Sequence, residues 1–148
     1  MRIYTDGIFD LCHYGHGNVF KQIKEQFGND ACVIVGVLND IDCHKYKGIT
    51  IMTNQERVKC LEHNKYVDEI IPNAPWIITE DFLKIHKIDI CAYHDSGIYN
   101  SNIDGHVVPK EMNIFFQTNR TPDISTTVLI DRILLNFDKF IERNKNKV

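Results

Sequence analysis

The amino-acid sequence predicts a single α/β domain built on a doubly wound parallel sheet. Segments with strand-like and helix-like patterns alternate along the whole chain, and such alternation builds right-handed βαβ units. The stretch 31–38 (ACVIVGVL) is an almost uninterrupted apolar run, which is typical of a parallel strand covered by helices on both faces. A chain of 148 residues can bury one core of its own. We therefore expect one Rossmann-like domain over 1–142, followed by a frayed polar tail over 143–148.

Apolar spacing and end signals locate the elements of the first half. Phe20, Ile23 and Phe27 recur at helical spacing, so they predict the first helix. The next helix begins with Thr53 and Glu56, which form a capping box. The predicted elements of this half are strand 2–5, helix 16–27, strand 31–38, polar loop 39–51 and helix 53–64.

The second half is read from the same signals. Pro72 is expected to end a short strand, and Thr79 is expected to cap a short helix. The segment 94–109 has little periodicity and is expected to be a long functional loop with a helical turn near its end. Apolar residues from Leu129 to Ile141 recur at helical spacing, so an amphipathic helix should close the fold. The predicted elements are strand 67–71, helix 79–87, strand 88–93, strand 113–117 and helix 125–142.

Composition excludes several classes of protein. The net charge is −3 and there is no long basic run, so binding to nucleic acid is not expected. The five cysteines are scattered and none forms a CxxC pair, which argues against a disulfide framework or a zinc site. The N-terminus does not have the pattern of a signal peptide, and no apolar run approaches the roughly 20 residues that span a bilayer. We expect a cytoplasmic protein with no stable membrane anchor.

The motif His13-Tyr-Gly15-His16 is the strongest functional signal. It follows the first strand and stands where a helix begins. A helix N-terminus offers N–H donors and partial positive charge, and a glycine lets a ligand approach the backbone closely. Two imidazoles beside such donors predict a phosphate site. The alternative is that the histidines merely cap a turn.

Loops after four strands, the histidine loop among them, should meet at one cleft. In parallel sheets, ligands bind beyond the carboxyl ends of the strands where the strand order reverses. The histidine loop begins there, as do the loops from residues 39, 94 and 118 onward. The sequence thus predicts one ligand site made from four segments.

Several segments together resemble a known family over nearly the whole chain. Asp6-Gly-Ile-Phe-Asp10 with the HxGH motif is similar to the cytidylyltransferase branch of the nucleotidyltransferases. The segments His44–Gly48, Asn73–Trp76, and Arg120–Thr127 (RTPDISTT) follow in the family's order. With Trp76 and His94-Asp-Ser-Gly-Ile-Tyr99, the chain resembles the choline-phosphate cytidylyltransferases most closely.

The resemblance implies transfer of a cytidylyl group from CTP to phosphocholine, with release of pyrophosphate. A phosphate monoester is already anionic near neutral pH, so no general base is needed. The site instead needs positive charge and fixed N–H donors around an anionic transition state. His13, His16, Lys47 and Arg120 are the expected catalytic residues. Lys45 is an alternative to Lys47, and a solvated loop lysine is the alternative role for Lys47.

The resemblance also implies a nucleotide site. Ser125 and Thr126 have a second reading as the N-cap of the last helix, and Arg57 has a second reading as a surface arginine paired with a carboxylate. Pro122 and Asp123 stand where the family has glutamate and glycine, which places an acidic group near a polyanion. The expected nucleotide-binding residues are Gly7, Ile8, Phe9, His16, Arg57, Arg120, Thr121, Ile124, Ser125 and Thr126.

A quaternary ammonium is usually held against aromatic faces backed by a carboxylate. His106 stands where the family has a further tyrosine, which weakens such a cage. Phosphoethanolamine therefore remains an alternative substrate, and glycerol 3-phosphate is a less favoured one. Trp76 has a second reading as core filling. The expected residues for choline phosphate are Asp6, Lys47, Trp76, His94 and Tyr99.

Further partners follow from the same resemblance. Lys65–Glu69 is similar to the family's dimer segment, so a homodimer is expected, with lysine where arginine is usual. The triphosphate implies Mg²⁺, although no carboxylate cluster marks a metal site and Asp6 and Asp10 are only the nearest candidates. The competing function is a CTP-binding module that has lost turnover, which the changes at Pro122, Asp123 and His106 motivate.

Overall fold

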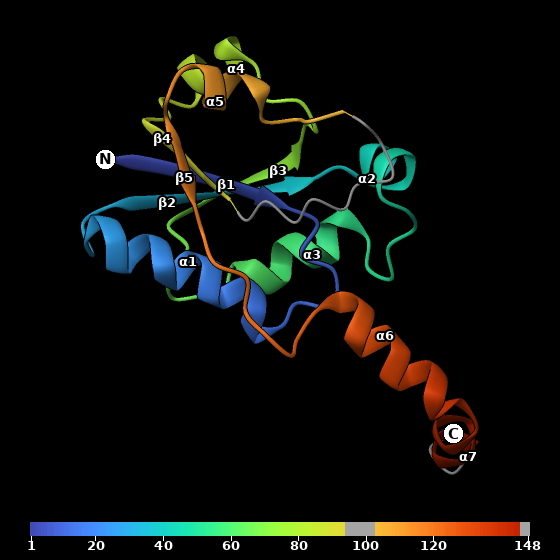
Figure 1. Cartoon of the computed structure of the whole chain (residues 1–148). Coiled ribbons are helices and arrows are strands. Elements are labelled where there is room, and N and C mark those ends of the chain that lie inside the picture. Colours follow the sequence, from blue (N-terminus) through green and yellow to red (C-terminus); the bar gives the residue numbers. More distant parts are fainter. Residues whose placement is uncertain (94–102, 146–148) are drawn as a thin grey trace.

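A computed structural model describes residues 1–93 and 103–145 (Figure 1). Within these residues five strands form one all-parallel sheet in the order β3-β2-β1-β4-β5. The order runs outward in both directions from the β1–β4 pair, so the sheet is doubly wound and the predicted fold class is confirmed. The strands are β1 (Arg2–Gly7), β2 (Cys32–Leu38), β3 (Glu69–Ala74), β4 (Ile90–Tyr93) and β5 (Phe115–Gln117).

Helices cover both faces of this sheet (Figure 1). Phe20 and Ile23 of α1 pack with Leu61 of α3 on one face, and Leu83 of α4 packs with Tyr4 on the other. Alternate residues along β1 and β2 enter the two cores, as the period of a strand requires. The helices are α1 (Tyr14–Phe27), α2 (Asp40–Tyr46), α3 (Asn54–Leu61), α4 (Glu80–Ile85), α5 (Val107–Glu111), α6 (Thr126–Leu135) and α7 (Phe137–Lys145).

Two local predictions were wrong. The segment predicted as a polar loop contains α2, which Asn39 caps by accepting a hydrogen bond from the Asp42 N–H, while Cys43 and Tyr46 are buried on its inner face. Pro72 lies inside β3 rather than ending it. Since β3 is an edge strand and its pairing with β2 is irregular near Leu38, a residue without an N–H is tolerated there.

The C-terminal helix also differs from its prediction. Asn136 interrupts it with φ −117° and divides it into α6 and α7. No residue of either helix is buried among the described residues, and both point away from the body of the sheet (Figure 1). The apolar face from Leu129 to Ile141 therefore does not close the fold. Helix α7 runs to Lys145, so it includes the first residues of the predicted tail; 146–148 lie outside the described residues.

Within residues 1–93 and 103–145, no helix has both the length and the hydropathy that a membrane-spanning segment needs.

Candidate active site

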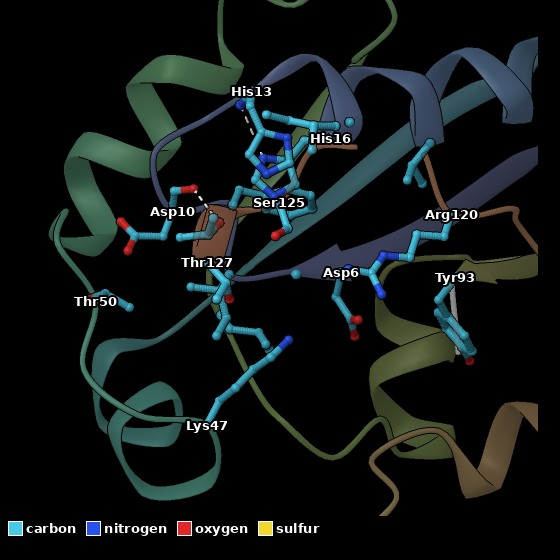
Figure 2. A pocket seen from close by; sticks show the side chains of 18 of the residues that line it. Asp6, Asp10, His13, His16, Lys47, Thr50, Tyr93, Arg120, Ser125 and Thr127 are labelled. Atoms are coloured by element: carbon cyan, nitrogen blue, oxygen red, sulfur yellow. Dashed lines mark hydrogen bonds between the residues drawn. The ribbon is translucent and has the colours of Figure 1, made fainter. Parts of the chain in front are cut away.

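A pocket of about 710 Å³ opens at the carboxyl ends of β1 and β4, where the strand order reverses (Figure 2). Its walls come from the loop after β1, the start of α1, the loop after α2, the segment 105–106 and the start of α6. The predicted convergence of several loops is thus present. The predicted site residues that line it are Asp6, Gly7, Ile8, Phe9, His13, His16, Lys47, Trp76, Arg120, Thr121, Ile124, Ser125 and Thr126.

His13 and His16 stand together at the start of α1. Their rings are stacked, with centroids 3.8 Å apart and an interplanar angle of 21°. Gly15 lies between them because a Cβ there would come within 2.9 Å of His13 Nδ1 and 3.0 Å of Ile124. The glycine therefore lets the two imidazoles and the α6 segment meet in one small space (Figure 2).

A hydrogen bond determines which ring nitrogen of neutral His16 carries the proton. The His13 N–H donates to His16 Nδ1 at 3.4 Å, so the proton of a neutral His16 ring sits on Nε2. Burial, together with the charges of His13 and Lys47, lowers the pKa of His16 to about 3. His16 is therefore a neutral donor in the ligand-free pocket, rather than the source of positive charge that the sequence suggested.

His13 is also an uncharged group in this pocket. Burial lowers the pKa of its imidazole. Both of its ring nitrogens are buried, and neither has a hydrogen-bond partner within the described part of the chain. A buried polar group without a partner costs stability, and a neutral imidazole has one donor and one acceptor to offer at this pocket.

Positive charge enters from two segments on different sides of the pocket. Figure 2 shows the Lys47 ammonium and the Arg120 guanidinium directed toward the part of the pocket that holds Asp6. Lys47 is the C-cap of α2, and desolvation of its ammonium lowers its pKa although the residue as a whole remains exposed. The two cations and the α6 N-terminus together make this pocket suited to a polyanion.

Asp10 holds three segments around the pocket. Its buried carboxylate accepts hydrogen bonds from the backbone N–H groups of Ile51 at 2.8 Å and Met52 at 2.9 Å. Its backbone carbonyl accepts a hydrogen bond from the Thr126 hydroxyl at 2.9 Å. The loop after α2 and the start of α6 are thus fixed to the loop after β1.

The start of α6 supplies the remaining donors. Ser125 is its N-cap and accepts the Val128 N–H at 3.1 Å, so the capping reading is confirmed. Thr126 and Thr127 are the first two residues of α6, so their backbone N–H groups have no acceptor within the helix. Because the Thr126 hydroxyl donates to the Asp10 carbonyl, the backbone N–H of Thr126 is its remaining donor at the pocket. The Thr121 hydroxyl accepts a hydrogen bond from Asn18 of α1, which steadies the segment before α6.

Asp123 takes a conformation that suits glycine. Its φ is +62°, in the left-handed region, where aspartate is tolerated better than most residues. Asp123 is exposed and does not line the pocket. The substitution therefore keeps the turn that glycine would make and keeps the extra carboxylate off the pocket wall.

Trp76 fills part of the core and also lines the pocket. It is only 7% exposed and packs with Leu38, Cys43 and Tyr46, with the Tyr46 ring centroid 5.0 Å away. The indole N–H donates to the carbonyl of Ile103 at 3.2 Å. The ring is thus fixed from behind while it lines the pocket.

Asp6 has a partner that sequence reasoning did not find. His106 Nε2 lies 3.0 Å and 3.2 Å from the two carboxylate oxygens of Asp6. The imidazole stacks on Tyr93, with ring centroids 3.7 Å apart. Tyr93 ends β4 and is a further pocket residue that was not predicted; its place at the end of the fourth strand was the available signal.

Arg57 lies behind the pocket rather than in its lining. Its side chain is 0% exposed and donates to the backbone carbonyls of Ile8 and Leu38 and to Asp40. The reading as a surface arginine is wrong, although the carboxylate partner is present. Arg57 supports the walls that carry Ile8 and Leu38, and it does not face the cavity.

His94 and Tyr99, both expected at the choline phosphate site, lie outside the described residues.

The two carboxylates that the sequence offers as nearest metal candidates, Asp6 and Asp10, already have partners within the protein. Nowhere in 1–93 or 103–145 do three or more His, Cys, Asp or Glu side chains gather as metal ligands. Both carboxylate oxygens of Asp10 accept backbone N–H groups, and Asp6 is bonded to His106. A carboxylate oxygen keeps a second lone pair when it accepts one hydrogen bond, so these contacts leave both side chains able to approach a metal–triphosphate complex.

Known proteins are similar to this chain in sequence. Residues 4–132 match the family model described as cytidylyltransferase-like. The chain is 43% identical to the choline-phosphate cytidylyltransferase of Saccharomyces cerevisiae over 145 residues, which are 97% of this chain and 34% of the yeast protein. It is 42% identical to choline-phosphate cytidylyltransferase A of Rattus norvegicus over 147 residues, which are 97% of this chain and 39% of the rat protein.

The ethanolamine-phosphate cytidylyltransferase of Mus musculus is less similar, at 34% identity over 136 residues, which are 91% of this chain and 33% of the mouse protein. The chain thus spans between about a third and a half of the length of the curated relatives it matches. Among solved structures, the lipopolysaccharide core biosynthesis protein of Thermoplasma volcanium GSS1 superposes with a TM-score of 0.63 at 20% identity, over 82% of this chain and 98% of that one. That likeness concerns the fold alone.

Proposed function

The chain belongs to the cytidylyltransferase-like family, and from that premise we propose that it transfers the cytidylyl group of CTP to phosphocholine. The products are CDP-choline and pyrophosphate. The observation that carries the proposal is the pocket at the β1–β4 switch, where stacked His13 and His16, two cationic side chains and the α6 N-terminus face one cavity. Similarity to the yeast and rat choline-phosphate enzymes over 97% of this chain directs the choice of phosphocholine.

The proposed reaction is an in-line displacement. An oxygen of the phosphocholine phosphate attacks the α-phosphorus of CTP, and the bond from that phosphorus to the pyrophosphate oxygen breaks. His16 donates through Nε2 to an oxygen of the α-phosphate as charge develops, and His13 offers a ring nitrogen beside it. Arg120 and the first N–H groups of α6 bind the triphosphate, while Lys47 draws the two phosphates together.

Magnesium, the oligomer and the compartment complete the proposal. CTP enters as its Mg²⁺ complex, since the triphosphate itself can supply the oxygen ligands. The protein is a homodimer, on the likeness of Lys65–Glu69 to the family's dimer segment, and sedimentation equilibrium tests this. A cytoplasmic location agrees with five free thiols, because reducing compartments keep cysteines unpaired.

The direct test supplies three candidate acceptors of the cytidylyl group in separate reactions. We expect pyrophosphate release from Mg²⁺ and CTP with phosphocholine, and much slower release with phosphoethanolamine or glycerol 3-phosphate. Faster release with phosphoethanolamine would replace the substrate and keep the reaction. CTP-dependent thermal stabilisation with no release from any acceptor would favour the module without turnover.

The second candidate substrate, phosphoethanolamine, rests on the pair between Asp6 and His106. A primary ammonium needs hydrogen-bond acceptors, whereas a quaternary ammonium needs aromatic faces. An imidazole in this corner makes a weaker face than a phenol, and the mouse ethanolamine-phosphate enzyme is 34% identical. The acceptor series above separates the two substrates.

Replacing Trp76 with alanine tests the aromatic wall. We expect KM for phosphocholine to rise about 5–30-fold, which corresponds to the loss of about 1–2 kcal/mol for a desolvated cation–π contact. KM for CTP should change little. Steady-state kinetics with each substrate varied in turn, the other held at saturation, measures both constants. The matched control is Phe137→Ala, which removes an exposed aromatic ring of α7. Unchanged phosphocholine kinetics in Trp76→Ala would show that Trp76 does not contact the substrate.

A further inference from the structure

The pair of Asp6 with His106 occupies the corner of the pocket beside Trp76, and the inference below rests on the proposed function. The side chains of Asp6 and His106 are 5% and 16% exposed. One imidazole N–H faces both oxygens of one carboxylate, at 3.0 Å and 3.2 Å. A partly desolvated contact of this kind responds strongly to the charge of either partner.

His106 is held in place from three directions. Its ring stacks on Tyr93 at 3.7 Å with an interplanar angle of 26°, and its backbone N–H donates to Asp104 at 2.9 Å. The preceding residue, Gly105, accepts the Ile78 N–H at 2.9 Å. A Cβ on Gly105 would come within 2.0 Å of the Trp76 carbonyl oxygen, so the segment is packed directly onto the Trp76 wall. The imidazole is therefore a built part of this corner.

Charged groups on several elements act on His106. Asp6 of β1 bonds its Nε2, and Asp104 lies 3.8 Å from its Nδ1 and pairs with Lys110 of α5 at 2.7 Å. Lys47 and Arg120 face the same corner from across the pocket (Figure 2). Burial alone would lower the pKa of His106, but the charge and hydrogen bond of Asp6 and the charge of Asp104 outweigh burial and Lys110, so the pKa is raised.

We propose that His106 determines how well this pocket accepts a cationic substrate, by acting as a protonation-dependent counter-ion to Asp6. When His106 is neutral, its Nε2–H still orients the carboxylate, and the negative charge of Asp6 is left for the substrate's ammonium group. When His106 is protonated, the imidazolium cancels that charge and repels the ammonium. The Asp6 carboxylate thus pairs either with the imidazolium of His106 or with the ammonium group of the substrate.

Linkage gives the sign of the effect. Because protonation of His106 opposes ammonium binding, ammonium binding lowers the pKa of His106 by an equal coupling free energy. The substrate therefore binds weakly at pH values below the pKa of the free pocket's His106, and it binds more tightly as pH rises through that value. The window lies above the ordinary histidine value of 6.5, since the pKa is raised.

The kinetic test compares wild type with His106→Gln, which keeps a hydrogen-bond donor and cannot titrate. We expect the wild-type KM for phosphocholine to fall at least about fivefold more than the variant's KM between about pH 6 and pH 9, at the low end of usual couplings. Titration of the phosphocholine phosphate, near pH 6, cancels in this comparison because both proteins meet the same substrate. The KM for CTP should not show the difference. Parallel phosphocholine profiles for the two proteins would overturn the proposal.

A second measurement needs no turnover. The His106 imidazole signals are followed by NMR over the same pH range, with and without saturating phosphocholine, after assignment with His106→Gln. We expect phosphocholine to lower the His106 pKa, and a pKa that rises or does not move overturns the proposal. If pyrophosphate release is absent with every acceptor, the proposed function fails, while this titration still decides the role of His106.

Discussion

Replacing His16 with alanine should lower kcat for pyrophosphate release by about 10²–10³-fold, the usual cost of removing one fixed donor to a developing oxyanion. The reason is that the His13 N–H holds His16 Nδ1, so His16 Nε2–H is a positioned donor and not a mobile charge. The KM for phosphocholine should change much less, because the donor matters most in the transition state. Steady-state rates at saturating CTP measure the loss.

The matched control for this variant is His63→Ala. His63 is exposed and lies outside the pocket, so its loss should leave kcat unchanged. The CTP-dependent shift in Tm should persist in His16→Ala, which separates lost catalysis from lost folding. A wild-type kcat in His16→Ala would remove the mechanistic role assigned to the imidazole.

Replacing Arg57 with methionine should lower the free energy of unfolding by about 2–6 kcal/mol, because two backbone carbonyls lose their donor at a cost of about 1–3 kcal/mol each. The carbonyls of Ile8 and Leu38 lose charged donors, and Asp40 loses its cation. Methionine retains much of the side-chain volume, so the loss reports hydrogen bonding more than cavity formation. Urea unfolding with an unchanged m value measures it.

Arg132→Met is the control for that experiment, because Arg132 is exposed on α6 and its loss should cost no more than about 0.5 kcal/mol. Equal stability of Arg57→Met and wild type would contradict the supporting role given to Arg57. Reduced stability with an unchanged KM for CTP would agree with its position behind the wall rather than in the lining.

The sheet was predictable because its strands carry their own signals. The apolar run that became β2 and the helical spacing of Phe20 and Ile23 identify the sheet core without tertiary information. Helix α2 was missed because it is short and polar, and only Cys43 and Tyr46 are buried. Its cap, Asn39 with Asp42, was a usable signal. Pro72 was misread because an edge position depends on strand order, which local sequence does not specify.

The candidate site was predictable where chemistry lies within one motif. His13 and His16 are three residues apart, and Ser125 begins its own helix, so their placement in the pocket wall could be predicted locally. The partner of Asp6 lies 100 residues away in the chain, and only the fold brings His106 to it. Arg57 was placed in the right neighbourhood, but whether a side chain faces a cavity or supports its wall depends on packing. The left-handed φ of Asp123 likewise required the backbone.

The contacts of Asp10 have a consequence for the CTP affinity of the proposed enzyme. Flexible phosphate-binding loops lose conformational entropy when a ligand orders them, and that loss weakens binding. Here one buried carboxylate fixes Ile51 and Met52, and the carbonyl of the same residue fixes Thr126, before any nucleotide arrives. The entropy of these two segments is lost during folding instead. Preorganisation of this kind lets a small domain direct more of its contact energy to holding the triphosphate.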